Sequence, residues 1–132
     1  MAIMSIKVLV ADDSDIVRRG IRHILEAQPE VELVGEAADF GETIQMTNDL
    51  KPQVIVMDLH MPNETKVAPL DVKSHLNDGS LLLAISFWNE EEAKALAESF
   101  GAVALLDKTE LSNKLIPTIM QLVLPNAGAA VK

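Results

Sequence analysis

The chain has 132 residues, of which 48% are apolar, and its formal net charge is −9 at pH 7; this length fits one domain with a sizeable core. The lack of cysteine excludes disulfides and thiolate zinc sites and favours a cytoplasmic protein. The acidic charge argues against a nucleic-acid surface, which needs clustered Lys and Arg, and the sequence has neither a secretory signal nor an apolar run near the ~20 residues of a membrane span.

The first part of the chain alternates between predicted strands and predicted helices. IKVLVA (6–11) is an unbroken apolar run apart from one lysine, as expected for a parallel strand covered on both faces. Residues 14–28 form a predicted helix with Ser14 as its N-cap. The predicted apolar face of this helix comprises Ile16, Val17, Ile21, Ile24 and Leu25. VELVGEA (31–37) alternates, which predicts an edge strand exposed on one side, and a weaker amphipathic helix follows over 40–50.

The remainder of the chain continues the same alternation. VIVM (54–57), LLLAI (81–85) and VALL (103–106) are apolar runs of strand length. The helices predicted beside them cover about 70–76, 89–100 and 110–123, and we expect Pro117 to bend the last one. Five successive strand–helix units predict a doubly wound (βα)5 three-layer α/β sandwich with a parallel sheet and right-handed crossovers. We expect one domain over 1–124, followed by a linker or disordered tail over 125–132.

Polar residues fall at the carboxyl ends of four predicted strands. Asp12 and Asp13 follow the first strand, Asp58 ends the third, Ser86 ends the fourth and Lys108 lies just past the fifth. Ligands of open α/β sheets bind at this edge, in the crevice where the strand order reverses. In a sheet of order 2-1-3-4-5 the crevice lies between strands one and three, so the three aspartates are expected to converge.

Three neighbouring carboxylates repel one another, and a hard divalent cation such as Mg²⁺, bound through oxygens, relieves that repulsion. One carboxylate can then attack a phosphoryl group to form an aspartyl phosphate, while Lys108 supplies positive charge and Ser86 a hydroxyl donor. Each residue alone has an ordinary explanation, since an Asp-Asp pair before a helix is commonly a cap. Their joint placement on four strand ends favours a phosphoryl-accepting aspartate.

Five segments of the chain carry a family resemblance and together cover nearly all of it: VLVADDSDIVRRGIRHIL, VELVGEAADFGETI, KPQVIVMDLHMP, LLLAIS and GAVALLDK. They resemble the receiver domain of two-component response regulators, in particular the receivers that precede a helix-turn-helix output domain of the nitrate-regulator type. The resemblance implies a flavodoxin-like fold with strand order 2-1-3-4-5. It also implies a cytoplasmic signalling switch with no enzymatic activity beyond its own phosphorylation and dephosphorylation.

The resemblance implies roles for the acidic residues position by position. Asp58 corresponds to the phosphoacceptor, which takes its phosphoryl group from a histidine kinase or a phosphotransfer protein. Asp12 and Asp13 correspond to the acidic pair that binds Mg²⁺ together with Asp58. Asp13 is the implied direct ligand, and the backbone carbonyl of His60 is another.

The remaining site positions include departures from the family pattern. Ser86 stands at the switch Thr/Ser position, and Lys108 stands at the position of the phosphoryl-binding lysine. Leu105 occupies the position of the usual switch aromatic, so that half of the switch is absent or rebuilt. Phe87 stands where a small residue is usual and is expected to crowd the entry to the site.

His60, Phe87 and Trp88 are candidates for tuning the rate at which water reaches an acyl phosphate, because bulk beside Asp58 would exclude in-line attack. The alternative interpretation is that they are loop residues without a kinetic role.

The leading functional hypothesis is a phosphorylation-controlled switch that changes its binding to a partner or to a second copy, with no nucleic-acid or membrane contact through this domain. The altered face would be the fourth helix, fifth strand and fifth helix, or the first and fifth helices. An alternative favoured by Leu105 and Phe87 is a receiver-like interaction module that works without phosphorylation. A cobalamin-binding loop is disfavoured because Asn63 replaces its glycine, and an aspartate-dependent phosphatase is disfavoured because residue 60 is His. Whether a DNA-binding domain follows Lys132 stays open.

Overall fold

The structure is a computed structural model, and it describes residues 5–61, 69–76, 79–87 and 90–124. Strands and helices alternate throughout these residues. The strands are β1 (Ile6–Ala11), β2 (Val31–Ala37), β3 (Val54–Asp58), β4 (Leu81–Ser86) and β5 (Ala104–Asp107). The helices are α1 (Asp15–Glu26), α2 (Phe40–Leu50), α3 (Pro69–Leu76), α4 (Glu90–Phe100) and α5 (Leu111–Val123), with a 3₁₀ turn at Lys108–Glu110.

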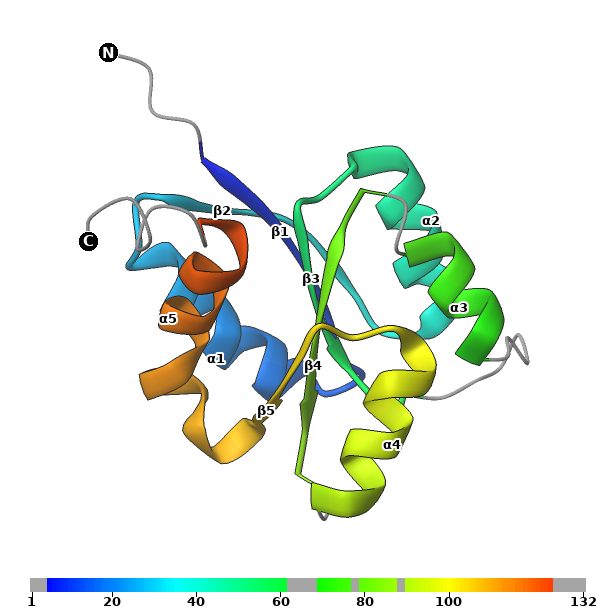
Figure 1. Cartoon of the computed structure of the whole chain (residues 1–132). Coiled ribbons are helices and arrows are strands. Elements are labelled where there is room, and N and C mark those ends of the chain that lie inside the picture. Colours follow the sequence, from blue (N-terminus) through cyan, green and yellow to red (C-terminus); the bar gives the residue numbers. More distant parts are fainter. Residues whose placement is uncertain (1–4, 62–68, 77–78, 88–89, 125–132) are drawn as a thin grey trace.

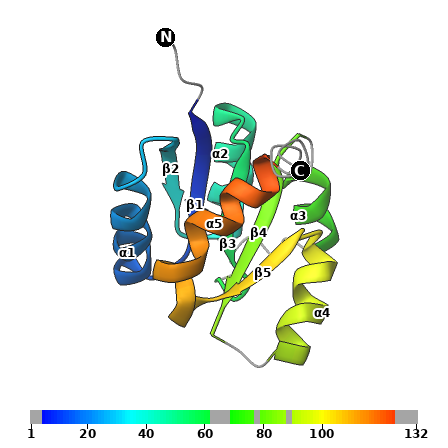
Figure 2. The ribbon, with the colours of Figure 1, turned by 60° about the vertical axis from the view of Figure 1, so that its left-hand side comes forward.

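The five strands form one parallel sheet in the order β2-β1-β3-β4-β5, which confirms the predicted doubly wound topology. Figures 1 and 2 show α1 and α5 on one face of the sheet and α2, α3 and α4 on the other. Among the described residues, none of the helices is both long enough and apolar enough to cross a membrane. Because the strands are parallel, the carboxyl ends of all five meet at one edge of the sheet, and the polar residues predicted to form a site lie at this edge.

Two apolar cores lie on opposite faces of the sheet, and they explain why the central strands are continuous apolar runs. On one face Ile21 and Leu115 pack with inward residues of β1, β3 and β4. On the other face Phe40 and Leu76 pack against the alternate residues of the same strands. Because both faces are covered, β3 is buried along its whole length, including Asp58 at its end. A charged side chain there costs free energy unless it is paired or hydrogen-bonded.

The predicted apolar face of α1 is correct except at Ile16. Ile21 and Leu25 are buried and Val17 packs against them, whereas Ile16 is 80% exposed. At about 100° per residue, Ile16 points about 140° away from Ile21 around the helix, which places it outside the buried stripe.

The alternation predicted for β2 is wrong beyond Leu33. The register with β1 shifts by one residue, so that Val8 pairs with Leu33 but Leu9 pairs with Gly35. The extra residue, Val34, interrupts the strict inward–outward alternation, and the residues from Leu33 to Glu36 are all partly buried.

The last helix continues through Pro117 to Val123, so the proline does not end the helix, and the predicted bend stays a prediction. Three expectations lie outside the described residues: the tail over 125–132, the role of Trp88 and the loop that includes Asn63.

Candidate functional site

Asp12 is positioned by one hydrogen bond from its backbone amide and one to its side chain. Its amide donates to the carbonyl of Ala37 (3.0 Å), which extends the pairing of β1 with β2. Its Oδ1 atom accepts from the amide of Ser14 (2.9 Å), and the Ser14 hydroxyl accepts from the amide of Val17 (3.3 Å) as the N-cap of α1. The chain therefore turns directly from strand to helix and leaves the Asp12 carboxylate fully buried, while the next residue, Asp13, is exposed.

Asp58 is held in the same manner at the end of β3. It pairs with Ile85 of β4, and the amide of Leu59 continues the pairing by donating to the Ile85 carbonyl (3.3 Å). The amide of His60 donates to Asp58 Oδ1 (3.2 Å), which is the local turn that aspartate favours at strand ends. The Asp58 residue is only 4% exposed, whereas His60 is exposed.

The structure brings three carboxylates and one ammonium group together. Oxygen atoms of Asp12, Asp13 and Asp58 all lie within 4.8 Å of one another. The Lys108 Nζ atom lies 2.6 Å from Asp12 Oδ2 and 3.4 Å from Asp58 Oδ1, and the lysine side chain is only 7% exposed. Because three acids face one base, negative charge is in excess at this edge of the sheet.

Burial raises the pKa of Asp58 above its usual value, and the neighbouring charge of Asp12 raises that pKa further. The Lys108 ammonium and the hydrogen bond from the His60 amide act in the opposite direction but do not cancel the effect of burial. The ionised form of Asp58 is therefore under-stabilised, and additional positive charge at this position would stabilise it.

The same residues fit a hard divalent cation. The Oδ2 atom of Asp12 is buried and accepts no hydrogen bond from the described residues; its contact with Lys108 is an ion pair rather than an aligned hydrogen bond. Asp12, Asp13 and Asp58 offer only oxygen atoms, which Mg²⁺ prefers at about 2.0–2.1 Å. Carboxylate oxygens within 4.8 Å of one another can share one such ion.

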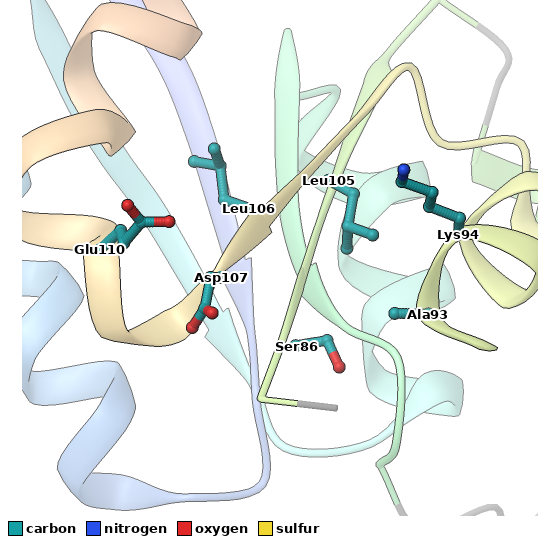
Figure 3. Close-up of a pocket in the computed structure, with 7 residues that line it drawn as sticks. All are labelled: Ser86, Ala93, Lys94, Leu105, Leu106, Asp107 and Glu110. Carbon is teal, nitrogen blue, oxygen red and sulfur yellow. The ribbon is translucent and has the colours of Figure 1, made fainter. Parts of the chain in front are cut away.

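Ser86 and Leu105 lie on a different side of the site. Ser86 is buried at the end of β4 and pairs in register with Asp107 of β5. Both line a cavity of about 230 Å³ that is also bordered by Leu105, Ala93 and other residues of α4 and β5. In Figure 3 Leu105 points toward Ala93, whereas the next residue of the strand points to the opposite face. Leucine at 105 thus leaves space beside Ser86.

Phe87 contacts the lysine of the site. Its ring centroid lies 5.1 Å from Lys108 Nζ, a cation–π distance, and the residue is 61% exposed. Phe87 therefore lies over Lys108 with much of its surface in solvent.

The sequence-based prediction missed Arg18. Its Nη1 atom donates to the backbone carbonyl of Asp12 (2.5 Å), and its Nε atom lies 3.4 Å from Glu36 Oε1 on β2. The available signal was an arginine one turn after the N-cap Ser14, but a surface arginine is common at such a position. The contact with Glu36 requires β2 and α1 to be packed together.

The chain matches known proteins over most of its length. The family profile of the response regulator receiver domain matches residues 8–120. The transcriptional regulatory protein LiaR of Bacillus subtilis is 34% identical over 115 residues, which cover 86% of this chain and 54% of LiaR. A protein-glutamate methylesterase/protein-glutamine glutaminase of Methanococcoides burtonii is 32% identical over 125 residues, which cover 89% of this chain and 36% of that protein.

Solved structures match as well. The response regulator domain of Thermotoga maritima CheB superimposes with a TM-score of 0.75 at 27% identity, covering 89% of this chain and 95% of that domain. The chain spans only about half of LiaR, and less of the methylesterase.

Proposed function

The chain belongs to the response regulator receiver domain family, and from this premise we propose that it is a phosphorylation-controlled switch of a two-component system. Asp58 accepts a phosphoryl group from the phosphohistidine of a histidine kinase or phosphotransfer protein. The observation that carries the proposal is the buried contact of Lys108 Nζ with Asp12 (2.6 Å) and Asp58 (3.4 Å) beside exposed Asp13.

In the proposed transfer, an Asp58 carboxylate oxygen forms a bond to phosphorus as the bond from phosphorus to the histidine nitrogen breaks, and the bonding electron pair leaves with the imidazole. Burial removes competing water from Asp58, and Lys108 offers its ammonium to a phosphoryl oxygen. Asp12, Asp13 and Asp58 would hold Mg²⁺, with the backbone carbonyl of His60 as a further ligand. Bound there, the ion supplies positive charge to the transferring group.

Phosphorylation adds negative charge and acceptor oxygens at Asp58, so Lys108 and Ser86 would re-orient toward the phosphoryl group. Two surfaces are close enough to respond. One is the cavity of about 230 Å³ beside Ser86. The other is a groove of about 330 Å³ between α1 and α5, where Phe87 and Lys108 both form part of the wall.

These surfaces would bind a second copy of the chain or an output domain. In this proposal residues 1–124 form the receiver and residues 125–132 form a linker. No enzymatic activity beyond the chain's own phosphorylation and dephosphorylation is part of the proposal. His60 and Phe87 are proposed to tune how long the phosphoryl group persists.

The test is incubation with Mg²⁺ and acetyl phosphate, followed by intact mass spectrometry. We expect the wild-type chain to gain one phosphoryl group. The Asp58→Asn variant should gain none. Asp107 is a matched control because it also ends a strand, but it is exposed and lies outside the acidic cluster, so Asp107→Asn should gain one phosphoryl group like wild type. An unmodified wild type, or a modified Asp58→Asn chain, would contradict the proposal.

A second candidate function is a receiver-like interaction module that works without phosphorylation. Two observations favour it: Leu105 leaves the cavity beside Ser86 without an aromatic side chain, and the Phe87 ring already lies on Lys108. The same experiment separates the candidates, because this module would form no adduct in the wild-type chain.

A further inference from the structure

Arg18 of α1 connects three separate parts of the site's surroundings. Its guanidinium donates to the backbone carbonyl of Asp12 (2.5 Å) and is paired with the carboxylates of Asp15 and, at 3.4 Å, Glu36. The side chain is only 15% exposed. A largely buried guanidinium that bonds a carbonyl in the loop after β1 limits how that loop can move.

The carbonyl that Arg18 bonds belongs to the peptide between Asp12 and Asp13. A peptide unit is planar, so fixing its carbonyl direction also fixes the amide plane and the Cα position from which the Asp13 side chain leaves. The Ser14 amide, which donates to Asp12 Oδ1 (2.9 Å), restrains the peptide on the other side of Asp13. Asp12 has a further restraint on its amide, which donates to Ala37 (3.0 Å). Asp13 is exposed, and its side chain has no hydrogen bond or ion pair to the described part of the chain. Its orientation therefore depends on its backbone.

We infer that Arg18 is a positioning residue that holds the Asp12–Asp13 peptide so that Asp13 faces Asp12 and Asp58 and the three carboxylates can share one divalent cation. The inference rests on the proposed function for the presence of that cation. Residues that hold metal ligands through a second layer of hydrogen bonds commonly contribute about 10–100-fold to metal affinity.

Arg22 provides a matched control one helical turn further along α1. It pairs with the same Glu36 through two hydrogen bonds of 2.8 and 3.0 Å and carries the same charge. Its side chain is 43% exposed, and its described polar contacts are with Glu36 rather than with the loop after β1. Substituting Arg18 or Arg22 with Met removes one positive charge and one partner of Glu36 in each case.

The two physical effects of removing Arg18 have opposite signs. Loss of a positive charge beside the acidic cluster, taken alone, strengthens the attraction of a divalent cation. Loss of the hydrogen bond to the Asp12 carbonyl frees Asp13 and weakens binding. A fall in affinity after Arg18→Met therefore reports positioning and not charge.

The experiment measures Mg²⁺ binding by isothermal titration calorimetry and Mn²⁺ binding by loss of the free-ion EPR signal, for the wild-type chain, Arg18→Met and Arg22→Met. We expect Arg18→Met to bind about tenfold more weakly or worse, and Arg22→Met to bind as tightly as wild type or slightly more tightly. In the acetyl phosphate reaction, Arg18→Met should need more Mg²⁺ for half-maximal rate but approach the wild-type rate at saturation. Unchanged or tighter binding in Arg18→Met, or equal losses in both variants, would overturn the inference.

Arg18→Lys keeps the charge and serves where Arg18→Met does not fold. An amine can reach the Asp12 carbonyl but lacks the fork that also engages Glu36, so we expect an affinity between those of wild type and Arg18→Met; wild-type affinity would overturn the inference. A wild-type chain that binds neither Mg²⁺ nor Mn²⁺ and forms no phosphoryl adduct would overturn the proposed function itself. Metal binding by wild type without a difference in the Arg18 variants overturns the positioning role alone.

Discussion

The two sides of the strand-end site differ in how tightly they are built. On the acid side, at the ends of β1 and β3, Lys108 lies 2.6 and 3.4 Å from two buried carboxylates. On the cavity side, at the ends of β4 and β5, Ser86 and Leu105 border about 230 Å³ of space. Charges at contact distance interact steeply with separation, whereas unfilled space beside a side chain costs only a moderate amount of stability. This difference predicts that substitutions are tolerated more readily on the cavity side than on the acid side.

The pKa values of two strand-end aspartates, one on each side of the site, are shifted in opposite directions. Burial raises the pKa of Asp58 on the acid side. Asp107, on the cavity side, accepts hydrogen bonds from the amide and then the hydroxyl of Thr109, and these lower its pKa. The two carboxylates thus have opposite preferences for protonation, although each ends a strand of the same sheet.

We expect the largest loss of stability when Lys108, the counter-charge of the acid side, is substituted. Lys108→Met leaves Asp12 and Asp58 buried without their counter-charge, and we expect it to lower the free energy of unfolding by about 3–5 kcal/mol. Lys114→Met removes an exposed pair with Glu110 (3.0 Å) and should cost about 0.5 kcal/mol or less. Urea unfolding at neutral pH without divalent ions measures both. Added Mg²⁺ should restore part of the Lys108→Met loss, and equal losses in the two variants would contradict a special role for the buried lysine.

A smaller effect tests the pKa contrast through the pH dependence of stability. Because the folded-state pKa of Asp58 is raised, its contribution to stability is present below the unfolded value of 3.8 and is lost as the pH rises through the folded value. Asp58→Asn should therefore become more stable than wild type as the pH rises toward neutral. Thermal unfolding without divalent ions over a pH series measures this difference.

In the same pH series, Asp107→Asn should change the stability with the opposite sign to Asp58→Asn. The lowered pKa of Asp107 contributes stability above its unfolded value, and this contribution is lost as the pH falls through the folded value. Asp107→Asn should be slightly less stable than wild type at neutral pH and equal to it in acid, with a small difference because the group is exposed. The same sign for both variants would refute the contrast.

We expect the smallest change in stability from a substitution that fills the space on the cavity side. Leu105→Phe places a larger side chain into the space beside Ala93, and we expect it to raise the free energy of unfolding by about 1 kcal/mol without changing Mg²⁺ affinity. Leu115 is fully buried in the core on the other face, so Leu115→Phe should destabilise by about 1–3 kcal/mol through overpacking. A changed Mg²⁺ affinity in Leu105→Phe would show that the two sides are not separable.

Most of the fold follows from local patterns, and the failures have identifiable causes. The run 6–11 is β1 itself because apolar residues in a covered strand need no alternation. The expectation for Ile16 is wrong because an apolar residue type does not by itself place a side chain on the buried face: Ile16 is 80% exposed on the far side of the helix from Ile21. The shift of β2 at Val34 arises from pairing with β1, which lies more than twenty residues away in sequence. Patterns within one element contain no information about such a register.

The sequence alone determines that Asp12, Asp58 and Asp107 each lie at or just after the end of a strand. Aspartate there favours a bond from the amide two residues further on, because this turn depends only on local backbone geometry. Parallel strands align their carboxyl ends, so the sequence also determines that the three residues share one edge of the sheet. Only the tertiary structure decides that the first two are buried beside Lys108 while the third is exposed, and that Arg18 reaches from α1 to both the Asp12 carbonyl and Glu36. Those contacts join residues distant in sequence, so no local pattern contains them. Burial then raises the pKa of Asp58, whereas the same local turn in exposed Asp107 leaves a lowered pKa.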